Sequence, residues 1–185
     1  MTATLAVVGA GPKAVAVAAK AAELRTMGVA APDVVVVERT GVAANWTAAG
    51  GWTDGEPRLG TNPEKDVGFP YRPALVPGRN AELDTAMMRH GWQSYLVATG
   101  QFAEWVDRGR PAPTHRRWAT YLGWVADAVG MHLIPGEVER ISVAGPQWEI
   151  RTHENPADPV IADAVMITGP GQAERSLLPG NPRVL

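Results

Sequence analysis

Residues 5–20, LAVVGAGPKAVAVAAK, decide the fold of this chain. The apolar start predicts a buried strand over residues 4–8, and the alanine-rich remainder predicts a helix from Pro12 to about Met27 that Gly28 ends. A run of β-branched residues over 34–38 predicts a second strand. Two strands joined by a crossover helix lie parallel, so the N-terminus predicts a βαβ unit.

The turn between the first strand and the helix has almost no side chains. In its Gly-x-Gly-x-x-Ala pattern, Gly9 permits a tight turn, Gly11 leaves room for a pyrophosphate, and Ala14 lets the helix pack closely on the strand. The helix N-terminus favours an anion, and Pro12 suits the first helical turn. Glu38, after the second strand, can accept hydrogen bonds from a ribose diol. The pattern predicts a dinucleotide site, against the alternative of a glycine turn that only joins two packed elements.

The rest of the chain predicts further helices and strands around an irregular segment. Residues 40–80 have little regular pattern. Helices are expected near 81–98, 101–108 and 113–131, the last with Thr114 as its N-cap. Strands are expected over 132–135, 137–143, 147–152 and 160–171, and the middle two form a hairpin.

Composition excludes several classes of protein. A formal net charge of −2 makes nucleic acid a poor partner. The chain has no cysteine, and its four histidines show no metal-ligand spacing, so no metal site is expected. The first apolar run breaks at Gly9, which is typical of a core strand and not of a signal peptide or membrane span. The expected location is the cytoplasm.

The glycine fingerprint alone does not distinguish FAD from a nicotinamide cofactor. A simple dehydrogenase would continue with another helix and parallel strand. Here the irregular segment GVAANWTAAGGWTDGEPRLGTNPEKDVGFPY, residues 41–71, follows the second strand. A hairpin-like pair of strands and then ADAVMITGPG, residues 162–171, come much later.

This layout resembles the two-dinucleotide flavoprotein monooxygenases. It is most similar to the N-hydroxylating monooxygenases of siderophore biosynthesis, in particular the mycobactin-type L-lysine N6-monooxygenases. The stretches that carry the resemblance are VVGAGPKAVAVA (7–18), Asn45-Trp46, RLGTNPEKDVGFPY (58–71), QSYLVATGQFAEWVDRGRPAPTHRRWATYLGWVA (93–126) and VMITGPG (165–171). Together they run through essentially the whole chain.

The resemblance implies an α/β fold and a redox function. Residues 1–170 would form a Rossmann-like FAD-binding domain, with a parallel sheet, flanking helices and an added β-hairpin-like element. Residues 171–185 would be the crossover toward an NADPH-binding domain that is absent from this chain. The implied reaction is N6-hydroxylation of L-lysine or a lysine derivative with NADPH and O₂, for a mycobactin-like hydroxamate siderophore. A homo-oligomer is possible.

The resemblance also assigns site residues. The residues implied to bind FAD are Gly9, Ala10, Gly11, Pro12, Lys13, Ala14, Glu38, Arg39, Trp46, Gly60, Val138 and Gly169. Lys65 is implied to pair with the carboxylate of the amino-acid substrate, whereas spacing alone favours a solvated lysine paired with Glu64 or Asp66. The family's glutamine falls on Gly60, a departure from its pattern. No acid–base catalyst is expected in this segment, because the flavin carries the redox chemistry.

Several alternatives stay open at this point. The chain could be a dinucleotide-binding module without turnover of its own, or part of another FAD- or NAD(P)-dependent oxidoreductase. A disulfide-type flavin reductase is disfavoured, because the chain has no cysteine. Trp46 and Trp52 could equally be loop anchors in the core. His115-Arg116-Arg117 is expected to be a solvated helix start.

Overall fold

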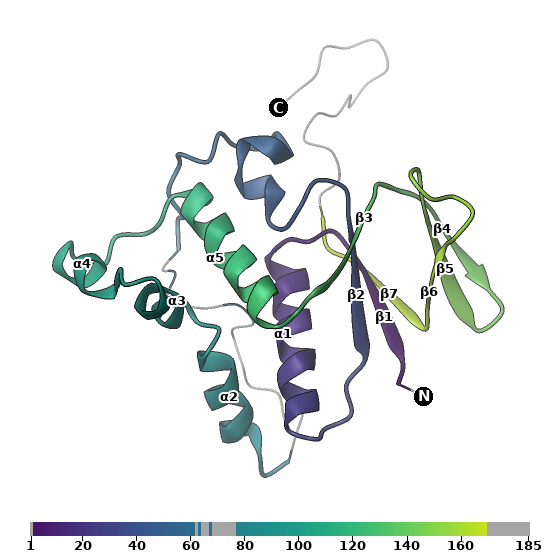
Figure 1. Cartoon of the computed structure of the whole chain (residues 1–185), viewed down its shortest axis with the longest axis horizontal. Coiled ribbons are helices and arrows are strands. Elements are labelled where there is room, and N and C mark those ends of the chain that lie inside the picture. The colour runs from purple at the N-terminus through teal and green to yellow at the C-terminus, as the bar shows by residue number, and fades with distance from the viewer. Residues whose placement is uncertain (1, 62, 64–66, 68–76, 170–185) are drawn as a thin grey trace.

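A four-stranded parallel sheet forms the centre of the fold (Figure 1). The computed structural model describes residues 2–61, 63, 67 and 77–169. The sheet has the order β3-β2-β1-β7. Its strands are β1 (Thr4–Val8), β2 (Asp33–Glu38), β3 (His132–Pro135) and β7 (Ala164–Ile167). All three strand pairs are parallel, which confirms the βαβ unit predicted at the N-terminus.

The crossover helix α1 (Pro12–Thr26) ends just before Gly28, as the sequence predicts. Gly28 adopts a φ of +73°, which glycine reaches without steric cost. Its amide donates to the carbonyl of Arg25, and the next amide, that of Val29, donates to Leu24. These bonds satisfy carbonyls that the helix end would otherwise leave without partners.

In the described part of the chain, four more α-helices follow: α2 (Asn80–Met88), α3 (Trp92–Ala98), α4 (Phe102–Asp107) and α5 (His115–Ala128). The single helix predicted over 81–98 is wrong, because the chain breaks between α2 and α3. The break is stabilised from outside: the Tyr121 hydroxyl donates to the His90 carbonyl at 2.7 Å, and Gly91 is extended, with ψ of 161°. The predicted N-cap of α5 is confirmed, since Thr114 Oγ1 accepts from the Arg117 amide.

Aromatic side chains join α3 and α5 into the main core. Trp92 and Tyr121 are fully buried and meet edge to face, with ring centroids 5.4 Å apart. Trp118 lies 5.0 Å from Tyr121 by the same measure. Rings at these separations add to the free energy gained from burying their area. This core anchors the N-terminus of α5, which contributes to the site described below.

A smaller antiparallel sheet lies on the side of the parallel sheet away from α1 and α5 (Figure 1). It consists of β4 (Val138–Ala144), β5 (Gln147–Thr152) and β6 (Val160–Ala162), so the predicted hairpin is confirmed. Ile150 and Ala162 pack with Ala6 and Val37 between the two sheets. The fold thus has three layers: helices, parallel sheet and antiparallel sheet.

The single strand predicted over 160–171 is wrong, because it is two strands in two sheets. β6 belongs to the antiparallel sheet and β7 to the parallel one. Asp163 marks the change: its carboxylate accepts from the Thr4 amide at 2.7 Å, and its own amide donates to the Thr4 carbonyl at 2.9 Å. The chain therefore bends onto the edge of β1.

The segment after β2 has only two short 3₁₀ turns before residue 51, η1 (Ala44–Trp46) and η2 (Ala48–Gly50). Among the described residues, no helix is both long enough and apolar enough to cross a membrane. The division of the chain at residues 170 and 171 stays a prediction, because residues 170–185 lie outside the described part.

Candidate dinucleotide site

The turn after β1 requires glycine at its first position. Gly9 has a φ of +95°, and its amide donates to the Val37 carbonyl at 2.9 Å. A Cβ atom here would lie 2.9 Å from Thr168 Oγ1, closer than van der Waals contact allows. The Thr168 hydroxyl lies within hydrogen-bonding distance of the carbonyls of Val8 (3.0 Å) and Gly9 (2.9 Å). The end of β7 therefore holds the turn that follows β1.

Gly11 leaves the start of α1 open. It is the N-cap and offers no side chain to the first turn, and Pro12 takes the first helical position. The space where its Cβ would stand is empty of described atoms within 4 Å. The first amides of a helix have no partner within the helix, and its dipole favours negative charge there. This cradle fits the pyrophosphate of a dinucleotide.

Glu38 joins the end of β2 to the glycine turn. Its carboxylate accepts from the amides of Ala10 and Thr40, each at 2.9 Å. A carboxylate has about four acceptor positions, so both oxygens can still accept from a ligand hydroxyl. The neighbouring Arg39 pairs with Glu137 at 3.3 Å, which connects β2 to the start of β4.

Two adjoining pockets open at this carboxyl edge of the parallel sheet. The first has a volume of about 210 Å³ and the second about 370 Å³. Gly9, Glu38, Asn45 and Gly169 line both. The first is completed by Val8, Val37, Arg39, Gly136, Glu137, Val138 and Ile167. The second is completed by Ala10, Gly11, Pro12, Trp46, Trp52, Thr53, His115 and Thr168.

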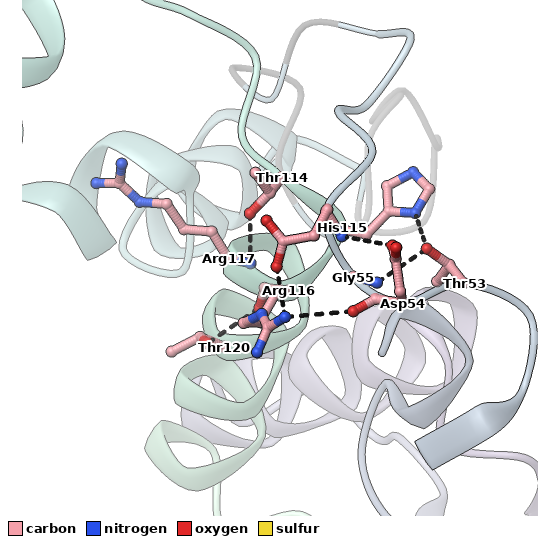
Figure 2. Close-up of polar contacts among 9 residues, drawn as sticks. Thr53, Asp54, Gly55, Thr114, His115, Arg116, Arg117 and Thr120 are labelled. Carbon is pink, nitrogen blue, oxygen red and sulfur yellow. Dashed lines mark hydrogen bonds and ion pairs between the residues drawn. The ribbon is translucent and has the colours of Figure 1, made fainter. Parts of the chain in front are cut away.

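Aromatic rings line part of the second pocket. Trp46 and His115 meet edge to face, with ring centroids 4.9 Å apart and planes at 90°. His115 Nδ1 lies 3.2 Å from Thr53 Oγ1 (Figure 2). Trp46 also packs against the main core, whereas Trp52 is 44% exposed and is not a core anchor. The pocket thus joins an anion cradle to a chamber with tryptophan and histidine rings in its wall.

The loop at Asp54–Glu56 docks on the start of α5 (Figure 2). The Arg116 amide donates to the Gly55 carbonyl at 2.9 Å, and the Arg116 guanidinium donates to the Asp54 carbonyl and pairs with Glu56. Gly55 has a φ of +91°, and a Cβ there would lie 3.2 Å from Arg116 Cβ. The docked loop sets the position of Thr53, which precedes it.

The expectation that 115–117 is a solvated helix start is wrong for two of the three residues. His115 is half-buried and lines the second pocket. Arg117 is also half-buried: it bonds Gln101, and its guanidinium lies over the Trp92 ring, 5.7 Å from the centroid. Only Arg116 is exposed. Packing of α5 on the aromatic core draws this turn inward.

The structure brings most of the predicted cofactor residues together. Those that line the pockets are Gly9, Ala10, Gly11, Pro12, Glu38, Arg39, Trp46, Val138 and Gly169. Lys13 and Gly60 are exposed and Ala14 is buried, and none of these three lines either pocket. Lys65 lies outside the described residues.

Sequence reasoning missed several pocket residues. Asn45, Trp52, Thr53, His115 and Thr168 were not assigned to the site, yet they line the second pocket. Asn45 could have been inferred from its neighbour Trp46. Thr53 and His115 are 62 residues apart and belong to no shared motif, so no sequence signal pairs them.

The curated relatives that match this chain carry the name L-lysine N6-monooxygenase. The chain is 76% identical over 185 residues to L-lysine N6-monooxygenase MbtG of Mycobacterium sp. (strain MCS). It is 71% identical over 185 residues to MbtG of Mycobacterium tuberculosis (strain ATCC 25618 / H37Rv). Each match covers all of this chain and 42% of the relative, so the chain spans about two fifths of their length. No family model matches the chain.

Solved structures confirm the fold. Lysine monooxygenase NbtG from Nocardia farcinica superposes with a TM-score of 0.85 at 51% identity, over 91% of this chain and 55% of that chain. Ornithine hydroxylase PvdA from Pseudomonas aeruginosa gives a TM-score of 0.62 at 19% identity, over 91% of this chain and 39% of that one. The predicted α/β class is therefore confirmed: the chain has the Rossmann-type fold of flavin-monooxygenase FAD domains.

Proposed function

We propose that this chain, which belongs to the family of N-hydroxylating flavin monooxygenases of siderophore biosynthesis, binds FAD in the two adjoining pockets. The observation that carries the proposal is the anion cradle of Gly9 and Gly11 at the junction of those pockets. A dinucleotide needs a pyrophosphate site between two chambers for its two ends. The described residues offer that order along one edge of the sheet.

Each part of the edge suits one part of FAD. The glycine turn and the α1 N-terminus would hold the pyrophosphate. Glu38 would accept from the adenosine ribose in the first pocket, where Val138 and Arg39 also lie. Trp46 would line the flavin chamber, the second pocket.

The proposed activity of the whole protein is N6-hydroxylation of L-lysine, or of a lysine derivative, with NADPH and O₂. When bound, FAD supplies the redox and oxygen-transfer chemistry. The described residues would bind and orient it. NADPH would bind in a further part of the protein, and Lys65 would pair with the substrate carboxylate. A mycobactin-like product, a cytoplasmic location and a homo-oligomer stay predictions.

Gly11→Val tests FAD binding without disturbing the fold. Gly11 has a negative φ of −79° and open space at its Cβ, so the apoprotein variant should fold, with a melting temperature only slightly lowered because valine is a poorer N-cap than glycine. The new side chain would occupy the pyrophosphate cradle. We expect the FAD dissociation constant to rise at least about tenfold, a loss of about 1.4 kcal/mol, in a flavin fluorescence titration.

Gly123→Ala is the matched control. Gly123 lies within α5, and a Cβ there also meets nothing within 4 Å. Alanine favours a helix over glycine, so this variant should be slightly more stable and should bind FAD normally. A Gly11→Val protein that binds FAD as tightly as the parent would contradict the proposal.

A further inference from the structure

His115 is held in the second pocket by three kinds of contact. It is the first residue of α5, and its backbone amide donates to the Pro57 carbonyl at 2.8 Å. Its ring meets Trp46 edge to face, and its Nδ1 faces Thr53. A ring held at its backbone, by an aromatic neighbour and at one nitrogen has a defined direction for its other nitrogen.

The hydrogen bonds around Thr53 favour one tautomer of His115. The Gly55 amide can only donate, and it donates to Thr53 Oγ1 at 3.0 Å. The Thr53 hydroxyl then still has its own hydrogen to place. His115 Nδ1, at 3.2 Å, is the acceptor that the described residues offer it. This arrangement favours the tautomer in which Nδ1 accepts from the Thr53 hydroxyl and the proton of the neutral ring is on Nε2.

The Nε2–H group has no acceptor among the described residues. In Figure 2 this nitrogen lies on the side of the ring turned away from Thr53. The ring lines the same pocket as the glycine cradle and Trp46. A donor fixed in a half-buried wall beside a predicted flavin chamber is suited to an acceptor atom of the flavin.

We propose that His115 is a positioning residue that donates an Nε2–H hydrogen bond to an acceptor atom of the flavin ring, and that Thr53 sets its tautomer. This inference rests on the proposed FAD site. A neutral donor stabilises the electron-rich reduced ring more than the oxidised one. The bond should therefore raise the midpoint potential of the bound flavin.

His115→Ala and Thr53→Val test this in the purified FAD-bound protein. His115→Ala should still bind FAD, since the glycine cradle is intact, with a dissociation constant raised about two- to tenfold. Its flavin absorption bands should shift, and its midpoint potential should become more negative. Thr53→Val leaves α5 untouched and should shift the bands in the same direction.

Thr53→Ser should restore the parent spectrum, because it keeps the hydroxyl. His153→Ala, which changes an exposed histidine outside both pockets, should alter none of these quantities. The double variant should shift the potential no further than His115→Ala alone, since Thr53 acts through that ring.

Two outcomes separate this inference from the proposed function. A parent protein that binds no FAD would overturn both. A parent that binds FAD, with folded His115→Ala and Thr53→Val variants whose spectrum and potential match it, would overturn only the role of His115.

Discussion

The carboxylate of Glu38 accepts a hydrogen bond from the backbone amide of Ala10 at 2.9 Å, so the end of β2 helps to shape the turn that follows β1. The second oxygen accepts from the Thr40 amide at the same distance. The Glu38 side chain thus stabilises the glycine turn in the protein without cofactor. The same side chain is the proposed acceptor for the ribose hydroxyls. The cradle is preformed by a residue that FAD would then use.

Glu38→Gln should weaken FAD binding. The glutamine amide group must face one of the two amides that Glu38 now accepts from, so one bond is lost and two donors oppose each other. We expect the FAD dissociation constant to rise about 10- to 150-fold, which corresponds to about 1.5–3 kcal/mol for bonds to a charged group. Flavin fluorescence titration measures this. Glu139→Gln, on an exposed carboxylate of β4, is the control, and an unchanged affinity of Glu38→Gln would contradict the assigned role.

Gly9→Ala should destabilise the protein. Alanine would have to adopt the left-handed backbone φ of +95° that glycine has here. Its Cβ atom would also lie too close to Thr168 Oγ1. We expect a loss of about 1–2 kcal/mol in the free energy of unfolding from the backbone alone, measured by urea denaturation. In a Thr168→Ala background, where the contact is gone and the positive φ remains, Gly9→Ala should cost less than it does in the parent protein but should still destabilise. Full stability of the single variant would show that the turn relaxes.

Local patterns predicted one part of the fold and could not predict another. The β1 turn and α1 follow from neighbouring residues, because glycine conformation and helix periodicity act over a few positions. The separation of residues 160–171 into two strands depends on the hydrogen bond between Asp163 and Thr4, which are 159 residues apart. The break at His90 depends on Tyr121, 31 residues away, and the pairing of Thr53 with His115 spans 62 residues. Contacts between residues so far apart produce no periodic pattern in the sequence, so the sequence alone could not predict them.

Glu23 and His90 form a buried polar pair that ties α1 to the break between α2 and α3. His90 Nε2 lies 2.6 Å from Glu23 Oε1, and the second carboxylate oxygen accepts from Arg89 at 2.9 Å. Glu23→Ala would leave the buried imidazole without this partner, and we expect a loss of about 1–3 kcal/mol in the free energy of unfolding. Arg89 is 64% exposed, so Arg89→Ala should cost less than about 1 kcal/mol. Equal losses from the two variants in urea denaturation would contradict this ranking.

Lys65→Ala should affect the substrate and spare the cofactor. The residue lies outside the described part of the chain, and its role is a proposal from the family resemblance. Losing a bond to the substrate carboxylate should raise the apparent KM for lysine about 10- to 150-fold. FAD content should stay unchanged, and Lys65→Arg should recover only part of the loss, because its head group has a different shape. A variant with unchanged KM would make Lys65 a solvated lysine.

The ionised carboxylate of Asp163 should contribute to the free energy of unfolding, and this contribution should be lost when acid protonates it. The Thr4 amide and then the Gln147 side chain donate to its carboxylate, and these bonds lower its pKa below the ordinary value, against a smaller opposing effect of desolvation. Because the folded pKa is the lower one, the contribution is complete above about pH 4 and is lost as the pH falls through the folded pKa.

Asp163→Asn removes this titration. The variant should be less stable than the parent at pH 7, and the difference should shrink between about pH 4 and pH 2. Urea denaturation across that range measures it, with Asp127→Asn on the exposed side of α5 as a control for the lost charge. A difference that stays constant down to pH 2 would mean that the Thr4 contact acts through geometry and not through the charge of Asp163.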